Sequence, residues 1–158
     1  MNKKLHLFFC LSLLVTFIVA DDGCTDPVAQ NFDPLADNDD GTCEYAPTFN
    51  EPDPVNLSFN EDTGPHSITL SDYFSDQDED NLSYQIESIQ DNSSILSSAS
   101  INSNIFLALT INEHDFGVVN ITINATDGTY DVSGTFSFTI DSVNDTPEIT
   151  AVNNQSPT

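Results

Sequence analysis

Apolar and polar residues alternate with a period of two along much of the chain after position 55. The clearest stretch runs from Val119 to Ala125, where asparagine or threonine separates each apolar residue from the next. Because successive side chains of a β-strand point to opposite faces, such a stretch predicts a strand with one buried face. The pattern recurs in the segments 55–59, 68–70, 82–86, 95–101, 105–111, 119–125 and 134–140.

Turn-forming residues lie between most of these segments, and the sequence has no helical period of useful length. Asp127 and Gly128 form a favoured hairpin pair and predict the turn into the last strand. Many short strands joined by turns are typical of an all-β sandwich. We therefore expect a two-sheet antiparallel sandwich of about seven strands and about 100 residues.

The first twenty residues have the features of a signal peptide. Lys3 and Lys4 form a basic start, residues 5–19 are mostly apolar, and Ala20 offers a cleavage site before Asp21. The apolar stretch is short for a transmembrane helix, and acidic residues follow it at once. We therefore expect a cleaved leader, no membrane insertion afterwards, and a protein that is secreted or held at the cell surface.

Residues 21–46 form a small acidic unit of their own. An exported chain meets an oxidising environment, where Cys24 and Cys43 can pair. The unit is too short to hold a core, so we expect this disulfide to staple it, with a contribution of about 3 kcal/mol. The unit resembles a short Cys-Thr-Asp-Pro…Asp-Asp-Gly-Ser-Cys repeat of secreted bacterial proteins, here with Thr42 in place of serine.

The run Asp-Asn-Asp-Asp-Gly at residues 37–41 does not fit an EF-hand loop. Counting back from Gly41 places Ala36 at the first ligand position, and no closing glutamate follows at the required distance. Two interpretations of the unit remain, a stapled spacer and a calcium site.

Three prolines, Pro47, Pro52 and Pro54, predict an extended linker over residues 46–54, because proline is excluded from helix interiors and favours extended backbone. The sandwich domain is expected to span residues 47–147. Pro147 then begins a second copy of the sequence around Pro47, and residues 148–158 resemble the truncated start of a next repeat. The chain is therefore expected to be part of a longer tandem array.

The chain holds 26 acidic residues and 2 basic ones, and both basic residues lie in the leader. The remainder is not expected to bind nucleic acid or an anionic membrane by electrostatics. Its densest acidic run, Asp76 to Asn81, has four carboxylates in five residues. Two unit charges about 4 Å apart repel by on the order of 4 kcal/mol at an effective dielectric of about 20. Ca²⁺ suits clustered carboxylate, amide and carbonyl oxygens, so this run predicts a calcium site; a solvated acidic turn is the alternative.

Four short motifs occur in order at the spacing of one domain. They are Asn-Glu-Asp-Thr at 60–63, Ser-Asp-Gln-Asp-Glu-Asp-Asn-Leu-Ser-Tyr at 75–84, Ala-Thr-Asp-Gly at 125–128 and Val-Asn-Asp-Thr-Pro at 143–147. Together they resemble bacterial cadherin-like repeats, the tandem Ig-like type of large secreted and surface adhesins. The resemblance covers about residues 47–147. It implies a Greek-key sandwich that joins neighbouring repeats head to tail, with Ca²⁺ at the junctions between domains.

The resemblance also implies two sets of ligands. At the N-terminal end of the domain they are Asp76, Asp78, Asn81 and Asp127. At the C-terminal end they are Glu61, Asp141 and Asp145, the last through its backbone carbonyl.

The sequence departs from the family's pattern in several places, among them Val143 and Asn144, which replace the Asn and Asp of the animal cadherin linker. The family's Asp-Arg-Glu loop is absent, and Glu113 or Asp115 is the substitute at that position. The linker before the domain, residues 43–49, has no Asn-Asp pair.

Other chemistry has little support. The sequence lacks a Gly-x-Ser-x-Gly nucleophile motif, and His66 and His114 have no second imidazole or cysteine at metal-ligand spacing, so both are interpreted as surface histidines. Phe59, Phe136 and Phe138 fall on the inward phase of their strands and are assigned to the core.

We therefore expect a non-catalytic calcium-binding module that acts in adhesion or as a rigid spacer. The alternative is a polysaccharide-binding accessory module of a secreted hydrolase. Expected partners are neighbouring repeats, or another cell-surface protein or glycan.

Overall fold

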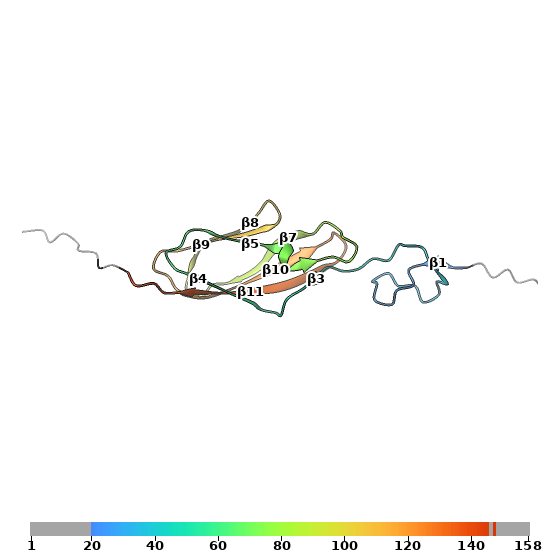
Figure 1. Cartoon of the computed structure of the whole chain (residues 1–158), viewed down its shortest axis with the longest axis horizontal. Coiled ribbons are helices and arrows are strands. Elements are labelled where there is room, and N and C mark those ends of the chain that lie inside the picture. The colour runs from blue at the N-terminus through green and yellow to red at the C-terminus, as the bar shows by residue number, and fades with distance from the viewer. Residues whose placement is uncertain (1–19, 146, 148–158) are drawn as a thin grey trace, which may run out of the picture. The chain divides into compact units, whose positions relative to one another are not determined.

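The computed structural model describes residues 20–145 and residue 147 (Figure 1). The predicted leader, apart from Ala20, and the predicted start of a next repeat at 148–158 lie outside these residues. The chain divides into two compact units, one ending at Cys43 and one beginning at Glu44. Within the described residues, no helix is long and apolar enough to cross a membrane.

The first unit is closed by the predicted disulfide between Cys24 and Cys43. Two very short strands, β1 (Asp22–Gly23) and β2 (Asn38–Asp39), pair in parallel beside it. Aspartate carboxylates accept hydrogen bonds from backbone N–H groups two residues further on, in turns that begin at Asp26, Asp33, Asp39 and Asp40. These carboxylates therefore shape the turns of a unit that has few buried side chains.

The second unit is a sandwich of two sheets, and each of the seven predicted segments contributes a strand. One sheet has the order β4 (Val55–Asn60), β11 (Asp131–Asp141), β10 (Gly117–Thr126), β7 (Ser83–Gln90). The other has the order β5 (His66–Thr69), β9 (Phe106–Ile111), β8 (Leu96–Asn102). All neighbours are antiparallel except β4 and β11, which run parallel.

The chain crosses between the sheets from β4 to β5, from β5 by way of β6 to β7, from β7 to β8 and from β9 to β10, as in an Ig-like Greek key (Figure 1). The predicted fold class is confirmed. The predicted turn at Asp127 and Gly128 joins β10 to β11, whose ladder runs without a break from Gly117↔Ile140 to Thr126↔Asp131.

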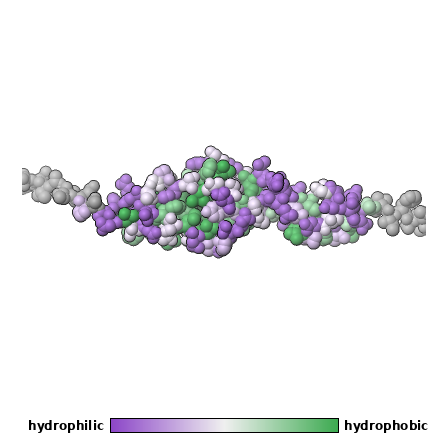
Figure 2. Space-filling view, viewed as in Figure 1, coloured by the Kyte–Doolittle hydropathy of each residue, from purple (hydrophilic) through white to green (hydrophobic). Residues whose placement is uncertain are grey.

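The core lies between the two sheets and follows the predicted alternation. Every second residue of β10 and β11 is buried: Val119, Ile121, Ile123, Ala125, Gly134, Phe136, Phe138 and Ile140. Leu107 and Leu109 of β9 meet them from the other sheet. Figure 2 shows that the visible face of the second unit is hydrophilic toward its two ends and mixed between them.

The segment 46–54 differs from the expected linker, because part of it belongs to the sandwich. Strand β3 (Thr48–Phe49) pairs antiparallel with β6 (Phe74–Ser75). The Phe49 ring packs on the rings of Phe74 and Phe136. It also covers Gly134, where a Cβ atom would lie 2.5 Å from the ring. A single phenylalanine without alternating apolar neighbours does not predict a strand. Strand β3 is therefore recognised only from its pairing with β6 and the packing of Phe49.

A second difference concerns Leu70, which the alternating pattern of residues 68–70 places in a strand. The strand β5 ends at Thr69, and Leu70 begins the short 3₁₀ helix η1 (Leu70–Asp72) while remaining fully buried. The turn redirects the chain toward β6 and keeps the apolar side chain in the core.

The strand directions define two ends of the sandwich. We call the end where β10 stops and β7 and β11 start the N-terminal pole, and the end where β4 and β11 stop and β10 starts the C-terminal pole. The loop 76–81 and the Asp127 turn belong to the N-terminal pole. Glu61 and residues 141–145 belong to the C-terminal pole. The predicted ligands therefore fall at opposite ends of the same sheet.

Candidate metal centres

The loop 76–81 at the N-terminal pole is organised by Asp76. Its Oδ1 accepts hydrogen bonds from the backbone N–H groups of Asp78 at 2.8 Å and Asp80 at 3.4 Å. Glu79 takes a left-handed conformation, with φ 62°, which completes the turn. The other oxygen of Asp76, Oδ2, is buried and has no hydrogen-bond partner. A buried carboxylate oxygen without a partner is costly, by about 1–3 kcal/mol or more, so a cation is a suitable neighbour for it.

Asp78 and Asp80 meet a third carboxylate, that of Glu44. One carboxylate oxygen of each lies within 4.8 Å of the others. The pairing of β3 with β6 explains this, because continuing the Thr48↔Ser75 register by three residues brings Tyr45 opposite Asp78. The Tyr45 N–H donates to Asp78 Oδ2 at 2.7 Å. Glu44 was not among the predicted ligands, although it lies in the linker where the resemblance places one.

The other two predicted residues of this pole, Asn81 and Asp127, are outside the group of three carboxylates. Asn81 is exposed and lines a hollow together with Asp76 and Asp80. Asp127 follows the end of β10, and its Oδ1 accepts hydrogen bonds from the N–H groups of Thr129 and Tyr130. Asp127 therefore shapes the β10–β11 turn and is not one of the three grouped carboxylates.

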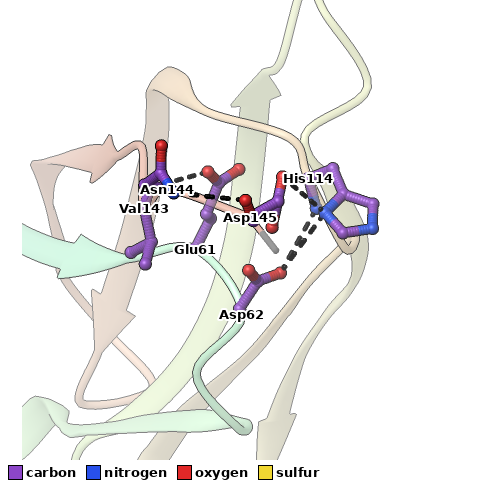
Figure 3. Close-up of polar contacts among 6 residues, drawn as sticks. All are labelled: Glu61, Asp62, His114, Val143, Asn144 and Asp145. Atoms are coloured by element: carbon purple, nitrogen blue, oxygen red, sulfur yellow. Dashed lines mark hydrogen bonds and ion pairs between the residues drawn. The ribbon is translucent and has the colours of Figure 1, made fainter. Parts of the chain in front are cut away.

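Glu61 is the buried charge of the C-terminal pole, with 3% of its surface exposed. Its N–H donates to the Asp141 carbonyl at 2.9 Å, and its Oε1 accepts from the Val143 N–H at 2.7 Å (Figure 3). Its Oε2 is buried and has no hydrogen-bond partner. Both lysines of the chain lie outside the described residues, so no lysine or arginine among those described offsets this charge.

A second group at this pole joins Asp62, His114 and Asp145 (Figure 3). The His114 Nδ1 lies 3.2 Å from Asp145 Oδ2 and 3.9 Å from Asp62 Oδ1. The negative charge of Asp145, followed by smaller contributions that include Asp62 and Glu113, raises the pKa of His114 above its ordinary value. No sequence motif indicates this group, because its members come from three separate segments of the chain.

The remaining predicted ligands of the C-terminal pole make other hydrogen bonds or lie outside the His114 group. Asp141 is exposed, and its Oδ2 accepts from the Ser58 hydroxyl at 2.6 Å, across the ladder to β4. The Asp145 carbonyl, expected as a ligand, accepts from the Asn144 side chain at 3.1 Å. Glu113 lines a hollow with Asp62 and does not join the His114 group. Asp115 donates its N–H to the Asn112 carbonyl.

Comparisons with known proteins do not assign the chain to a family. No family profile matches it. A stretch of 24 residues is 75% identical to ribulose bisphosphate carboxylase/oxygenase activase, chloroplastic, of Arabidopsis thaliana and 71% identical to the protein of the same name from Oryza sativa subsp. japonica. This stretch is 15% of the chain and spans 5% of either protein.

Among solved structures, the chain is similar to an endo-fucoidan hydrolase, MfFcnA4, from glycoside hydrolase family 107, with TM-score 0.47 and 22% identity over 68% of this chain and 15% of that chain. It is also similar to titin domain M7, with TM-score 0.34 and 12% identity over 60% of this chain and 93% of that one.

Proposed function

We propose that the second unit is a non-catalytic, calcium-binding, cadherin-like module of an exported protein, acting in adhesion or as a rigid spacer. The observation that carries this proposal is a pair of buried carboxylate oxygens without partners, Asp76 Oδ2 at one pole and Glu61 Oε2 at the other. Both belong to residues for which the family resemblance implies a calcium ligand. The described residues include no lysine or arginine to offset either charge.

The residues of the N-terminal pole fit calcium. Ca²⁺ takes roughly six to eight oxygen ligands, with carboxylates preferred. Glu44, Asp78 and Asp80 each offer one oxygen within a small volume, and Asp76 Oδ2 lies on the loop that carries two of them. Asn81 adds an amide oxygen beside the same hollow.

The C-terminal pole is less complete. Glu61 has a desolvated carboxylate. Its N–H donates to the Asp141 carbonyl and its Oε1 accepts from the Val143 N–H, and both bonds hold it against the chain that leaves the sandwich. Asp141 and Asp145 lie two residues before and after Val143, but their described hydrogen bonds engage Ser58 and Asn144. A neighbouring repeat would supply the remaining oxygen ligands.

A bound calcium ion would supply positive charge at each pole. The attraction of each carboxylate to the shared ion would then outweigh the repulsion among the carboxylates. The ion would also hold together the segments that carry them. Binding to the folded state alone also stabilises that state by mass action. In an array, the same effect at each junction would stiffen the connection between repeats.

Export is part of the proposal. The disulfide of the first unit suits an oxidising compartment, where calcium at millimolar levels would occupy modules of weak affinity.

Thermal unfolding of the chain in millimolar calcium, compared with EDTA at matched ionic strength, tests the proposal. Occupation at about a hundred times Kd would add about 2.7 kcal/mol, and 1 kcal/mol raises the Tm of a domain of this size by about 4–8 °C. Asp78→Asn and Glu61→Gln should each reduce the calcium-dependent rise. Glu51→Gln, which neutralises an exposed carboxylate outside both groups, is the matched control and should leave it unchanged. An identical Tm in calcium and EDTA would rule out the proposed function for this chain.

A further inference from the structure

We propose that the C-terminal pole also holds a site for a divalent transition-metal ion of the zinc class, formed by the His114 imidazole with the carboxylates of Asp62 and Asp145. This site differs from the proposed calcium sites in its ligands, since it uses a ring nitrogen and the Asp145 side chain. It does not depend on calcium binding.

The three ligand atoms have the spacing of a metal site. Zinc bonds to nitrogen and oxygen at about 2.0–2.2 Å, which puts two ligands of a tetrahedral ion about 3.4 Å apart. Nδ1 of His114 lies 3.2 Å from Asp145 Oδ2 and 3.9 Å from Asp62 Oδ1, distances that bracket this value. One possible ligand atom of each residue lies within 4.8 Å of the others. Small side-chain rotations would therefore bring them around one ion.

The donor set selects the class of ion. Calcium and magnesium take oxygen ligands, whereas imidazole suits zinc, copper, nickel and iron. One nitrogen and two carboxylates leave a fourth tetrahedral position for water or for a group from a partner. The side chains of His114, Asp62 and Asp145 are 65%, 34% and 49% exposed, so an ion can reach them from solvent.

Glu61, whose buried oxygen also supports the calcium proposal, gives a further reason for a cation at this place. It is the residue before Asp62, it is buried, and one of its carboxylate oxygens has no partner. Figure 3 shows its carboxylate directed toward the segment of Val143 to Asp145 that carries one of the three ligands. A dication bound by Asp62 and Asp145 would therefore lie beside an uncompensated negative charge that favours its binding.

The backbone conformation also brings two of the three residues together. Asp62 and His114 both adopt left-handed conformations, with φ 58° and 64°, which non-glycine residues rarely adopt. In this arrangement the His114 N–H donates to Asp62 Oδ1 at 3.4 Å, so the two loops are already joined. An ion at this place would fasten the exit segment, through Asp145, to both of these loops.

The experiment is a zinc titration of the full chain in competition with a chromophoric chelator, with millimolar calcium present throughout to fill oxygen-only sites. Imidazole NMR signals of the same samples report which histidine binds. The variants are His114→Gln and Asp145→Asn, with His66→Gln as the matched control, because His66 is the other histidine of the described residues and lies outside the group. Loss of an outer-shell partner weakens metal binding about 10- to 100-fold, so loss of a ligand should weaken zinc binding at least about tenfold.

The proposal expects zinc binding in the wild type and in His66→Gln, a shift of the His114 signals alone, and at least tenfold weaker binding in both site variants. Unchanged zinc affinity in His114→Gln would overturn it, as would a zinc-dependent shift of His66 without one of His114. Absence of zinc binding by the wild type in calcium would also overturn it. The wild-type NMR result decides the question even if a variant folds poorly.

Discussion

The two poles of the sandwich carry the same sign of charge but are built differently. At the N-terminal pole, Asp76, Asp78 and Asp80 come from one short loop, and only Glu44 arrives from elsewhere. At the C-terminal pole, Asp62, His114 and Asp145 come from three separate loops. The first pole presents oxygen ligands alone, while the second adds an imidazole nitrogen. The two ends of one fold thus carry different sets of side-chain donor atoms.

Burial differs between the poles as well. Glu61 is almost wholly buried, whereas Asp80 and Glu44 are exposed to solvent. Water screens exposed charges well and buried charges poorly. Most of the charge at the N-terminal pole therefore lies on solvated groups, with one buried oxygen, Asp76 Oδ2, while at the C-terminal pole the buried charge is that of Glu61.

The largest effect that separates the poles is expected from Glu61→Gln in the presence of EDTA. The amide keeps an oxygen that can accept from the Val143 N–H, and it removes a buried charge without a counter-ion. We expect the free energy of unfolding to rise by about 1–3 kcal/mol, because a buried charge without a partner costs more than a buried neutral amide. Denaturant unfolding measures it, with Glu51→Gln as the control. A destabilised Glu61→Gln protein would show that its carboxylate is better compensated than the geometry indicates.

Substitution of Glu44, the one grouped carboxylate that comes from outside the loop, should have the next largest effect. Glu44→Gln takes a charged oxygen from the group with Asp78 and Asp80. We expect calcium binding at this pole to weaken about tenfold, equivalent to about 1.4 kcal/mol, as measured by calorimetric titration. Zinc binding at the other pole should not change. If calcium affinity is unaltered, Glu44 is a solvated neighbour and not a ligand.

Salt should distinguish the poles with a smaller effect. Asp80→Asn relieves repulsion among exposed carboxylates, and such surface pairs are worth about 0–1 kcal/mol. In EDTA, we expect its gain in stability at low ionic strength to disappear in molar salt, because the Debye length falls to about 3 Å. The gain in the free energy of unfolding from Glu61→Gln should persist in molar salt. Equal salt sensitivity of the two variants would contradict the difference in burial.

The smallest effect is a pH dependence at the C-terminal pole. Asp145 raises the pKa of His114, so the folded state holds this proton more tightly than the unfolded state. The resulting stability is fully present below the unfolded pKa of about 6.5 and is lost as pH rises through the higher folded pKa.

NMR titration in EDTA should show His114 losing its proton at a higher pH than His66, whose pKa is lowered by burial. Asp145→Asn should move the His114 titration down and leave that of His66 in place. Identical titrations of His114 in the two proteins would refute the pairing.

Period-two alternation was sufficient to predict the sandwich. It located β4, β7, β8, β9, β10 and β11 to within a few residues, because a strand with one buried face leaves that signature in its own sequence. It did not predict strand β3, where a single side chain, that of Phe49, packs on the core. Phe49 is held by Gly134, Phe74 and Phe136, and none of these lies near it in the sequence.

The sequence by itself determined the alternation, the disulfide pair and the acidic loop 76–80, since each depends on neighbouring residues or on the only two cysteines after the leader. Only the tertiary structure decided that Glu44 meets Asp78 and that His114 meets Asp62 and Asp145. It also decided which carboxylate oxygens lose their contact with water. Those features depend on the register of the strands and on the way the chain crosses between the sheets. Both bring loops together that are far apart in the sequence, so no local sequence pattern predicts them.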